Sequence, residues 1–267
     1  MLPRMLKYPR THHLVGSRLQ HGDHDLAAVP FAEVRGRHLV VEEKMDGANA
    51  GLSFTASGEL LLQSRGHYLL GGPRERHFDL FKQWAHTHAE TLYTALGARF
   101  VMYGEWLYAK HTCYYDALPH YFMEFDLYDR ETETFLSTGR RAELLAGLPV
   151  VSVAVLWEGA PQRLRDLTDW VGPSRFKTRL WRERLLSAAA QAAVSEEQVL
   201  RETDREETME GLYLKVEEEG QVVQRLKWVR PSFLSAILDS GSHWLARPII
   251  HNQLAEGVDL WASSSSL

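Results

Sequence analysis

Short apolar runs separated by turn residues recur along the chain and predict a fold built largely from β-strands. Valine, isoleucine and aromatic side chains favour strands because they pack well on a pleated, half-buried surface. The runs at 39–43 and 49–54 flank the tight-turn pair Asp46-Gly47, which predicts that they pair as a hairpin. The remaining predicted strands lie at 60–63, 100–107, 121–128, 150–157, 210–217 and 221–229.

The last two predicted strands face each other across Glu219-Gly220 and form a second hairpin. Side chains alternate between the two faces of a strand. Lys215 therefore lies on one face of the first strand, and Arg225 and Lys227 share one face of the second. This spacing predicts a hairpin that directs cationic side chains toward one cavity.

Helical spacing of apolar residues is clearest at 76–96 and predicts a helix whose apolar stripe packs on the core. Serine caps the free N–H groups at a helix N-terminus, so Ser137 and Ser195 predict helices at 138–146 and 196–202. Two more helices are expected at 174–192 and 232–238. Helices inserted between mostly hairpin-connected strands predict the α+β class.

The composition is that of an ordinary globular protein, with 267 residues of which 45% are hydrophobic and 24% charged. No apolar run approaches the roughly 20 residues that a membrane span needs, and the N-terminal residues do not resemble a signal peptide. We therefore expect a cytoplasmic location and no membrane partner. Cys113 is the only cysteine, which excludes an internal disulfide and a thiolate metal cluster. The serine run at 263–266 predicts a disordered end.

The charge is unevenly distributed along the chain. The formal net charge is −5, whereas nucleic-acid enzymes normally carry an electropositive surface. Residues 163–184 are rich in arginine and residues 196–219 are rich in glutamate. Each run taken alone is better explained as the solvated face of a helix, whereas the two together are consistent with separate basic and acidic surfaces.

Lys44 is the strongest candidate for chemistry because it lies at a predicted strand end, beside the Asp46-Gly47 turn. There its amine can attack a phosphoanhydride and form a covalent nucleotidyl intermediate. A lysine two residues before Asp-Gly also occurs in solvated hairpins, so the short motif alone does not decide between the two interpretations. Further motifs downstream decide it.

Several short motifs follow Lys44 in a fixed order, and together they resemble those of an ATP-dependent RNA ligase of the covalent nucleotidyltransferase superfamily. Single motifs arise by chance, whereas an ordered series in strand-like surroundings does not. The motifs are Lys44-Met45-Asp46-Gly47-Ala48-Asn49, Ser64-Arg65-Gly66, Tyr103-Gly104-Glu105-Trp106, Phe122-Met123-Glu124-Phe125-Asp126, Glu210-Gly211-Leu212-Tyr213-Leu214-Lys215 and Arg225-Leu226-Lys227.

Two positions bear on the branch of this superfamily. DNA ligases and capping enzymes usually have arginine where this chain has Asn49, and asparagine is similar to the RNA-ligase branch that includes a phage nick-sealing ligase and the kinetoplastid editing ligases. Arg225 departs from the usual lysine of the last motif, which leaves its role open, since arginine is a planar fork rather than a flexible ammonium.

The resemblance implies the family's nucleotidyltransferase (ATP-grasp-like) fold, with two mainly antiparallel sheets flanked by helices. It implies an adenylyltransferase domain at 1–230 and a short helical extension at 231–267 that ends in the serine run. The segments outside the motifs are short, so we expect a near-minimal catalytic module.

The resemblance also implies the reaction. Lys44 would attack the α-phosphorus of ATP and hold AMP, the AMP would pass to an RNA 5′-phosphate, and an RNA 3′-OH would then displace it, as in RNA repair. The expected cofactors are ATP and Mg²⁺, with Mn²⁺ as an alternative. The expected partner is RNA with 5′-phosphate and 3′-OH ends, and whether a kinase or phosphatase heals those ends first stays open.

The motif residues receive their roles from the resemblance. Glu105 would bind the ribose, Phe125 would stack on adenine, and Glu210 would hold the metal. Lys215, Lys227 and the metal would lower the pKa of Lys44. Asp126 would support the site, and Arg18 is an expected RNA contact. The nucleotide-binding set is Glu43, Asp46, Gly47, Asn49, Arg65, Glu105, Phe125, Lys215, Arg225 and Lys227.

Other functions remain compatible with these motifs. A DNA ligase or a capping-type guanylyltransferase would use the same lysine chemistry. A nucleotide- or RNA-binding module without catalysis would retain the pocket but form no covalent adduct.

Overall fold

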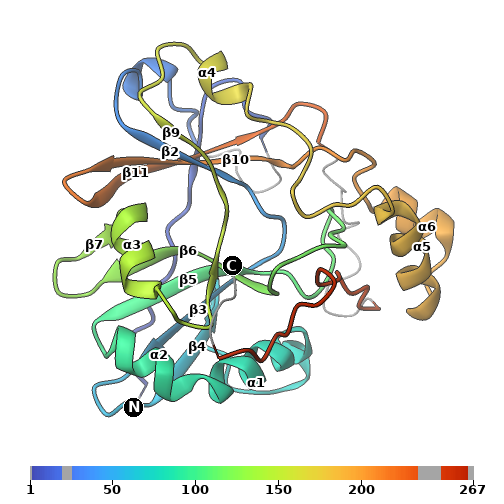
Figure 1. Ribbon diagram of the computed structural model, residues 1–267, viewed down its shortest axis with the longest axis horizontal. Coiled ribbons are helices and arrows are strands. Elements are labelled where there is room, and N and C mark those ends of the chain that lie inside the picture. Colours follow the sequence, from blue (N-terminus) through green and yellow to red (C-terminus); the bar gives the residue numbers. More distant parts are fainter. Residues whose placement is uncertain (1, 20–25, 234–247, 264–267) are drawn as a thin grey trace.

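The computed structural model describes residues 2–19, 26–233 and 248–263. Its strands form one hydrogen-bonded path in the order β4-β3-β5-β6-β7-β11-β10-β2-β9, and neighbours along this path are antiparallel. Helices lie outside the strands, which gives the predicted α+β class (Figure 1).

The strands fall into a lower and an upper group (Figure 1). The lower group contains β4 (Leu60–Ser64), β3 (Ala48–Phe54), β5 (Phe100–Trp106) and β6 (Phe122–Asp129). The upper group contains β11 (Gln221–Val229), β10 (Gly211–Glu218), β2 (Leu39–Glu43) and β9 (Val155–Gly159). The short strand β7 (Thr134–Leu136) pairs with both β6 and β11 and so joins the groups. Two-residue strands β1 (His12–His13) and β8 (Val151–Ser152) add parallel pairs to β11 and β6.

The helices cover the edges of this strand assembly. Below the lower group lie α1 (Asp79–Thr87) and α2 (Ala89–Leu96), preceded by the 3-10 helix η2 (Pro73–Phe78). The helix α3 (Thr138–Leu145) follows β7, α4 (Arg165–Thr168) follows β9, and α5 (Trp181–Gln191) packs with α6 (Glu196–Arg201) at one side. A short 3-10 helix, η1 (Phe31–Glu33), precedes β2.

Each strand group has its own core. Under the lower group, Phe81, Trp84 and Leu92 of the helices pack against strand residues such as Leu52 and Met102. The upper group buries aliphatic side chains of β2, β10 and β11. A third apolar cluster lies beside the loop that follows β2 and includes Met45. Burial of apolar area drives folding. Packing of these apolar clusters therefore fixes the positions of the polar residues that lie between them.

The predicted hairpin at 39–54 is wrong. Strand β2 pairs with β10 and β9, whereas β3 pairs with β4 and β5, so residues 44–47 cross from one strand group to the other. Hydrogen bonds to a distant loop hold the crossing segment in place. Asp46 Oδ2 accepts hydrogen bonds from the N–H groups of Thr112 and Cys113 at 2.7 and 2.6 Å. Long-range partners therefore replace the turn.

The single predicted strand at 150–157 is two strands on different groups. Strand β8 pairs with β6, and β9 pairs with β2. The chain changes groups at Val153, whose N–H binds Glu124 O, and Ala154, whose carbonyl accepts the N–H of Glu43. Both parts of the run at 150–157 are apolar, so the sequence pattern shows no break where the chain passes from one strand group to the other.

Two predicted helices have different bounds. The helix at 76–96 is broken at His88, which has φ −103° and ψ 10°, so that α1 and α2 each turn an apolar side toward the lower strands. The helix at 174–192 begins only at Trp181, because the polar groups of Ser174 and Thr178 bind Glu43 and Asp116 instead. Ser137 and Ser195 cap α3 and α6 as predicted.

The expected helix at 232–238 and the serine run at 263–266 lie almost wholly outside the described residues. The described part of the C-terminal segment packs back on the fold. Asn252 accepts the N–H of Tyr115 at 2.9 Å and donates to Leu107 O at 2.7 Å, which fixes the loop between β5 and β6. Within the ranges that the structure describes, no helix has the length and apolar character needed to cross a membrane.

Candidate active site

A cavity of about 1660 Å³ lies where residues 44–47 cross between the two strand groups. The crossing is rigid, since Asp46 N donates to Tyr115 Oη at 2.9 Å and Gly47 N donates to Glu105 Oε1 at 3.0 Å. A side chain at Gly47 would meet Trp106 O at 2.6 Å, so only glycine allows the loop to lie this close to β5. The predicted residues that line the cavity are Glu43, Lys44, Asp46, Gly47, Asn49, Arg65, Glu105, Phe125 and Lys227.

Lys44 lies at the inner end of β2, and its ammonium bonds to Glu210 Oε2 at 2.7 Å. Burial lowers the pKa of Lys44, but the carboxylates of Glu210 and Asp46 more than offset it, so the pKa lies above its ordinary value. The expectation that Lys215 and Lys227 lower this pKa is wrong for the chain by itself, because carboxylates dominate the surroundings of the amine.

Glu105 lies on β5 and faces the same cavity as Lys44. Burial raises its pKa to about 8; Lys44 opposes this, whereas Asp46 and Glu210 add to it. A carboxyl group that titrates near neutral pH is typical of a functional site. It is placed to accept hydrogen bonds from a hydroxyl-bearing ligand once ionised.

Phe125 forms one wall of the cavity and contacts Tyr8, which also lines the cavity. The two rings are 5.1 Å apart with an interplanar angle of 70°, an edge-to-face contact. The Tyr8 hydroxyl lies between Asp126 Oδ2 and Tyr213 Oη. Asp126 therefore supports the site through Tyr8 rather than by facing the cavity.

Asn49 lies at the start of β3 and lines the cavity. Its side-chain oxygen is buried and accepts no hydrogen bond from any residue that the structure describes. Such a group costs free energy unless a partner satisfies it. A ligand hydroxyl or amine in the cavity would supply that partner.

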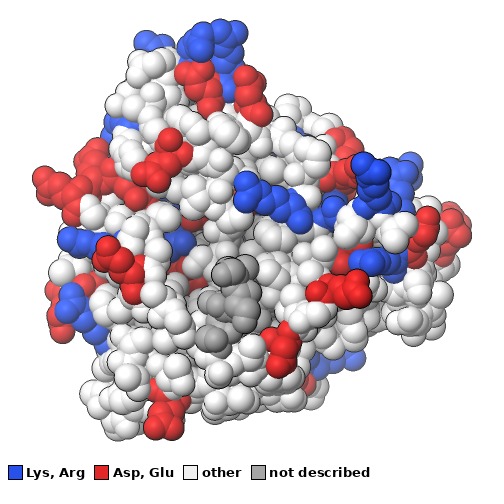
Figure 2. Space-filling view, in the orientation of Figure 1, with Lys and Arg blue, Asp and Glu red and all other residues white. Residues whose placement is uncertain are grey.

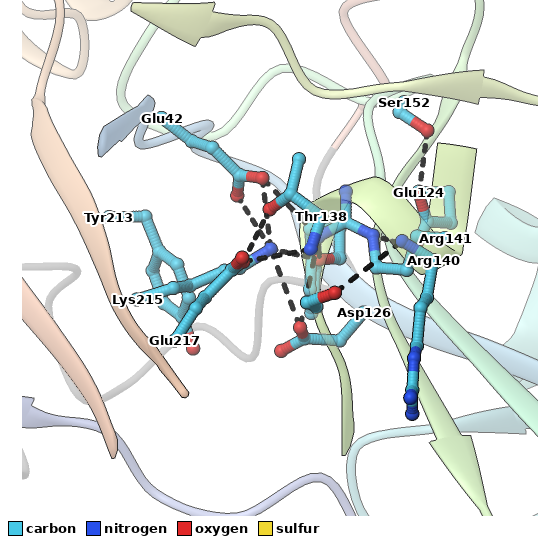
Figure 3. Close-up of polar contacts among 12 residues, drawn as sticks. Glu42, Glu124, Asp126, Thr138, Arg140, Arg141, Ser152, Tyr213, Lys215 and Glu217 are labelled. Atoms are coloured by element: carbon cyan, nitrogen blue, oxygen red, sulfur yellow. Dashed lines mark hydrogen bonds and ion pairs between the residues drawn. The ribbon is translucent and has the colours of Figure 1, made fainter. Parts of the chain in front are cut away.

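Lys215 does not line the cavity. It is fully buried behind it, where Nζ contacts Glu42 at 2.9 Å and Asp126 Oδ1 at 3.4 Å and donates to Phe125 O (Figure 3). Burying an ammonium this deeply requires paired carboxylates and hydrogen bonds. Lys215 holds the Phe125 backbone in place from behind.

Arg141 of α3 completes this buried ionic group, which also contains Glu124 (Figure 3). Its guanidinium lies 3.1 Å from Glu124 Oε1, 3.3 Å from Glu42 Oε1 and 3.8 Å from Asp126 Oδ1. Glu42, Glu124 and Asp126 contribute three carboxylates against the two cations Arg141 and Lys215, and burial raises the pKa of Glu124.

Arg225 lies opposite Lys215 on the β10–β11 hairpin, but outside the cavity lining. Its guanidinium lies 3.7 Å from the Phe135 ring centroid and 5.5 Å from that of Tyr8. A planar guanidinium stacks on rings in a way that lysine cannot reproduce. Lys227, two residues further along the same face of β11 and opposite Tyr213, lines the cavity.

Arg18 is not brought to the cavity, since Nη1 donates to Pro231 O at 2.9 Å. Other residues were missed by the sequence motifs: Tyr8, Arg76 and His111 line the cavity and Arg141 lies behind it. None of these four residues belongs to the motifs that follow Lys44 in the sequence. His111 is placed by its neighbours Thr112 and Cys113, whose N–H groups bind Asp46.

The residues of this site offer few protein ligands for a divalent cation. Among the residues that the structure describes, no three His, Cys, Asp or Glu side chains are placed to share one metal ion. Glu210 is a buried carboxylate that does not itself line the cavity and meets the site at Lys44 Nζ. Mg²⁺ is commonly held by one or two carboxylates with phosphate oxygens and water as its other ligands, which agrees with this donor set.

Comparison with known proteins gives a family for the chain. The fold resembles an archaeal ATP-dependent RNA ligase, with a TM-score of 0.51 and 16% identity over 85% of this chain and 48% of that one. A Naegleria gruberi RNA ligase mutant with ATP and Mn gives a TM-score of 0.48 and 16% identity over 75% of this chain and 52% of that one. The chain thus spans about half the length of these solved structures.

A search of curated proteins finds no match. The family model for RNA ligase matches residues 37–229, from just before β2 to the end of β11. The motifs from Lys44 to Lys227 all fall inside this range. Because the match covers more than half of the sequence, the chain belongs to the RNA ligase family.

Proposed function

We propose that the chain is an ATP-dependent RNA ligase that joins 5′-phosphate and 3′-OH ends through AMP bound covalently to Lys44. One observation carries the proposal: the amine of Lys44 lies in a large cavity together with Glu105, Asn49 and Phe125, and the same cavity is lined by the cationic Lys227. These are the groups needed to bind a nucleoside and to place its phosphate beside a nucleophile.

The nucleoside would occupy the part of the cavity between β3, β5 and β6. Phe125 offers a ring for the base, and Glu105 and Asn49 offer oxygens for the ribose hydroxyls. Lys227 and Arg65 would neutralise the phosphates. ATP is the expected nucleotide by family membership, and the similar Naegleria gruberi structures hold ATP or AMP with Mn.

In the first step, Lys44 Nζ forms a bond to the α-phosphorus, and the bond from that phosphorus to the bridging oxygen breaks with loss of pyrophosphate. Glu210 Oε2, 2.7 Å from Nζ, is placed to take the proton that the ammonium must lose. A divalent cation supplies charge neutralisation for the phosphates when bound, and Glu210 is the residue that would hold it.

In the second step, an oxygen of an RNA 5′-phosphate displaces Lys44 from the α-phosphorus. In the third step, an RNA 3′-OH attacks the 5′-phosphate and AMP leaves. Lys44 is regenerated in the second step, so one cavity serves all three displacements. A role in RNA repair, with or without an end-healing kinase or phosphatase, and a cytoplasmic location belong to the same proposal and rest on the sequence alone.

The experiment is a covalent-adduct assay. The protein is incubated with labelled ATP and Mg²⁺ and then analysed by denaturing electrophoresis and peptide mass spectrometry. Label on Lys44 that is absent from the Lys44→Ala protein supports the proposal, and subsequent transfer to RNA 5′-phosphate ends identifies the substrate. Label from GTP but not ATP would indicate a guanylyltransferase, sealing of DNA but not RNA would indicate a DNA ligase, and binding without any adduct would indicate a non-catalytic module.

A further inference from the structure

A strip of exposed arginines begins next to the nucleophile loop. Glu43 directly precedes Lys44. Its buried carboxylate accepts hydrogen bonds from the Ser174 hydroxyl at 2.5 Å and from the backbone N–H of Arg175 at 3.3 Å. The next residue, Phe176, packs in the same apolar cluster as Met45. The segment from 174 to 176 is thus fixed to both residues that flank Lys44, while the Arg175 side chain itself is exposed.

The chain then continues into α5 and exposes Arg179 and Arg182. Arg182 stacks on the Trp181 ring at 5.2 Å, and Lys177 lies 4.9 Å from the same ring, so the start of the helix is held in place. The exposed Arg205 lies alongside, since its carbonyl accepts a hydrogen bond from Arg182.

Two arginines of this surface carry charges that are not neutralised by a neighbouring carboxylate of the described residues within ion-pair distance. Arg175 and Arg179 form no ion pair with any part of the chain that the structure describes. Two other arginines of the basic run do form ion pairs, Arg163 with Asp166 at 3.1 Å and Arg184 with Asp116 at 3.2 Å.

The surroundings make this surface distinctive. The whole chain has a net charge of −5, yet basic side chains gather where it runs into α5, with acidic side chains toward the outer edge (Figure 2). The exposed acids Glu183 and Glu207 belong to the same region and do not outnumber the arginines. A polyanion is repelled by most of an acidic molecule and attracted to such a patch. Exposed arginines without ion pairs are well suited to bind phosphates bidentately.

We propose that Arg175, Arg179 and Arg182 form a phosphate-binding strip that holds the RNA backbone next to the end being joined at Lys44. This inference rests on the proposed RNA ligase function and assigns its RNA-docking surface. The strip acts after the nucleotide is bound, so it is needed for transfer of AMP to RNA and for sealing, and not for formation of the lysyl adduct.

The test compares two double variants that remove the same charge. Arg175→Ala/Arg179→Ala removes the exposed pair, and Arg163→Ala/Arg165→Ala removes two arginines at α4, away from α5 (Figure 1). For each protein, adduct formation with ATP alone, RNA affinity by gel shift, and the RNA KM for sealing are measured over a range of salt concentrations.

The strip variant is expected to form the adduct at the parental rate, while its RNA affinity and KM worsen by about tenfold and its salt dependence falls by roughly one unit for each phosphate that is no longer bound. The α4 variant is expected to match the parent. Parental RNA affinity and salt dependence in the strip variant would overturn the proposal, and so would an equal loss in the α4 variant. Failure of the ligase proposal is distinguishable from failure of the strip proposal. If the chain is not a ligase, the parent protein forms no adduct with ATP, and the gel shift still tests whether the strip binds RNA.

Discussion

The Nζ atom of Lys44 lies 2.7 Å from Oε2 of Glu210, and this contact joins the end of β2 to the residue that precedes β10. The two residues are separated by 166 positions in the sequence. Glu210 is fully buried, so its charge acts strongly on the amine. The pair keeps Lys44 protonated until a nucleotide and a cation change the local charge.

Replacing Glu210 by glutamine is expected to lower the pKa of Lys44, because the carboxylate is the main group that raises it. The measurement is competitive acetylation of Lys44 as a function of pH, read by peptide mass spectrometry without metal or nucleotide. Glu218→Gln, which removes a carboxylate paired with the distant Arg37, is the matched control. An unchanged titration of Lys44 in Glu210→Gln would show that the contact does not control the amine.

Nucleotide binding is expected to depend on pH through Glu105, whose pKa is about 8. The ionised carboxylate accepts hydrogen bonds from ribose hydroxyls more strongly than the protonated form, so affinity should rise with pH up to about 8 and level off above it. Below that pH the loss approaches roughly tenfold per pH unit if the protonated form does not bind. Lys44, with its raised pKa, does not titrate in this window.

The measurement is equilibrium binding of ATP in the absence of divalent metal. Glu105→Gln should bind more weakly and lose this pH dependence, since glutamine does not titrate. A parental affinity that is flat across pH 8, or the same slope in Glu105→Gln, would assign the effect to another group.

Gly47 and Gly66, two glycines from the motifs, are expected to differ in how well they tolerate substitution by alanine. In Gly47→Ala the new Cβ would lie 2.6 Å from Trp106 O and 2.8 Å from Leu107 Cδ2, so the nucleophile loop must move. In Gly66→Ala the new Cβ would meet no atom within 4 Å, and alanine should be tolerated there. A misplacement near 1 Å costs on the order of 100-fold in rate, which is the expected decrease in adduct formation in Gly47→Ala. Equal activity of the two variants would contradict the close packing at Gly47.

The buried ionic group is expected to make Arg141 important for stability. Arg141→Met leaves the carboxylates of Glu42 and Glu124 with one buried cation fewer, and breaking such a group costs about 3–5 kcal/mol of unfolding free energy. Arg163→Met breaks an exposed pair and should cost less than about 1 kcal/mol. Urea denaturation of both variants checks the difference, and comparable midpoints would show that the buried group is not stabilising.

Local sequence pattern was sufficient for most of the strands, and the ordered series of motifs indicated Lys44 as the residue at the centre of the site. Strands β2 and β11 have the predicted bounds, and the other predicted strands differ by one residue at one or both ends, except the run at 150–157, which is divided between β8 and β9. The motif around Lys44 was found without knowledge of the fold, and so were Glu105 and Phe125, which the structure brings to the same cavity. Alternation on a strand and the backbone freedom of glycine are local properties, so they can be inferred from neighbouring residues.

Pairing between distant segments was decided by the tertiary structure. The sequence does not show that β2 pairs with β10 and β3 with β5, because an Asp-Gly pair fits both a hairpin and a crossing loop. It also does not show that Lys215 turns away from the cavity, since alternation gives the face of a strand but not the carboxylates buried behind it. Tyr8 and Arg141 enter the site through contacts with residues far along the chain, and such contacts leave no periodic signal in the sequence.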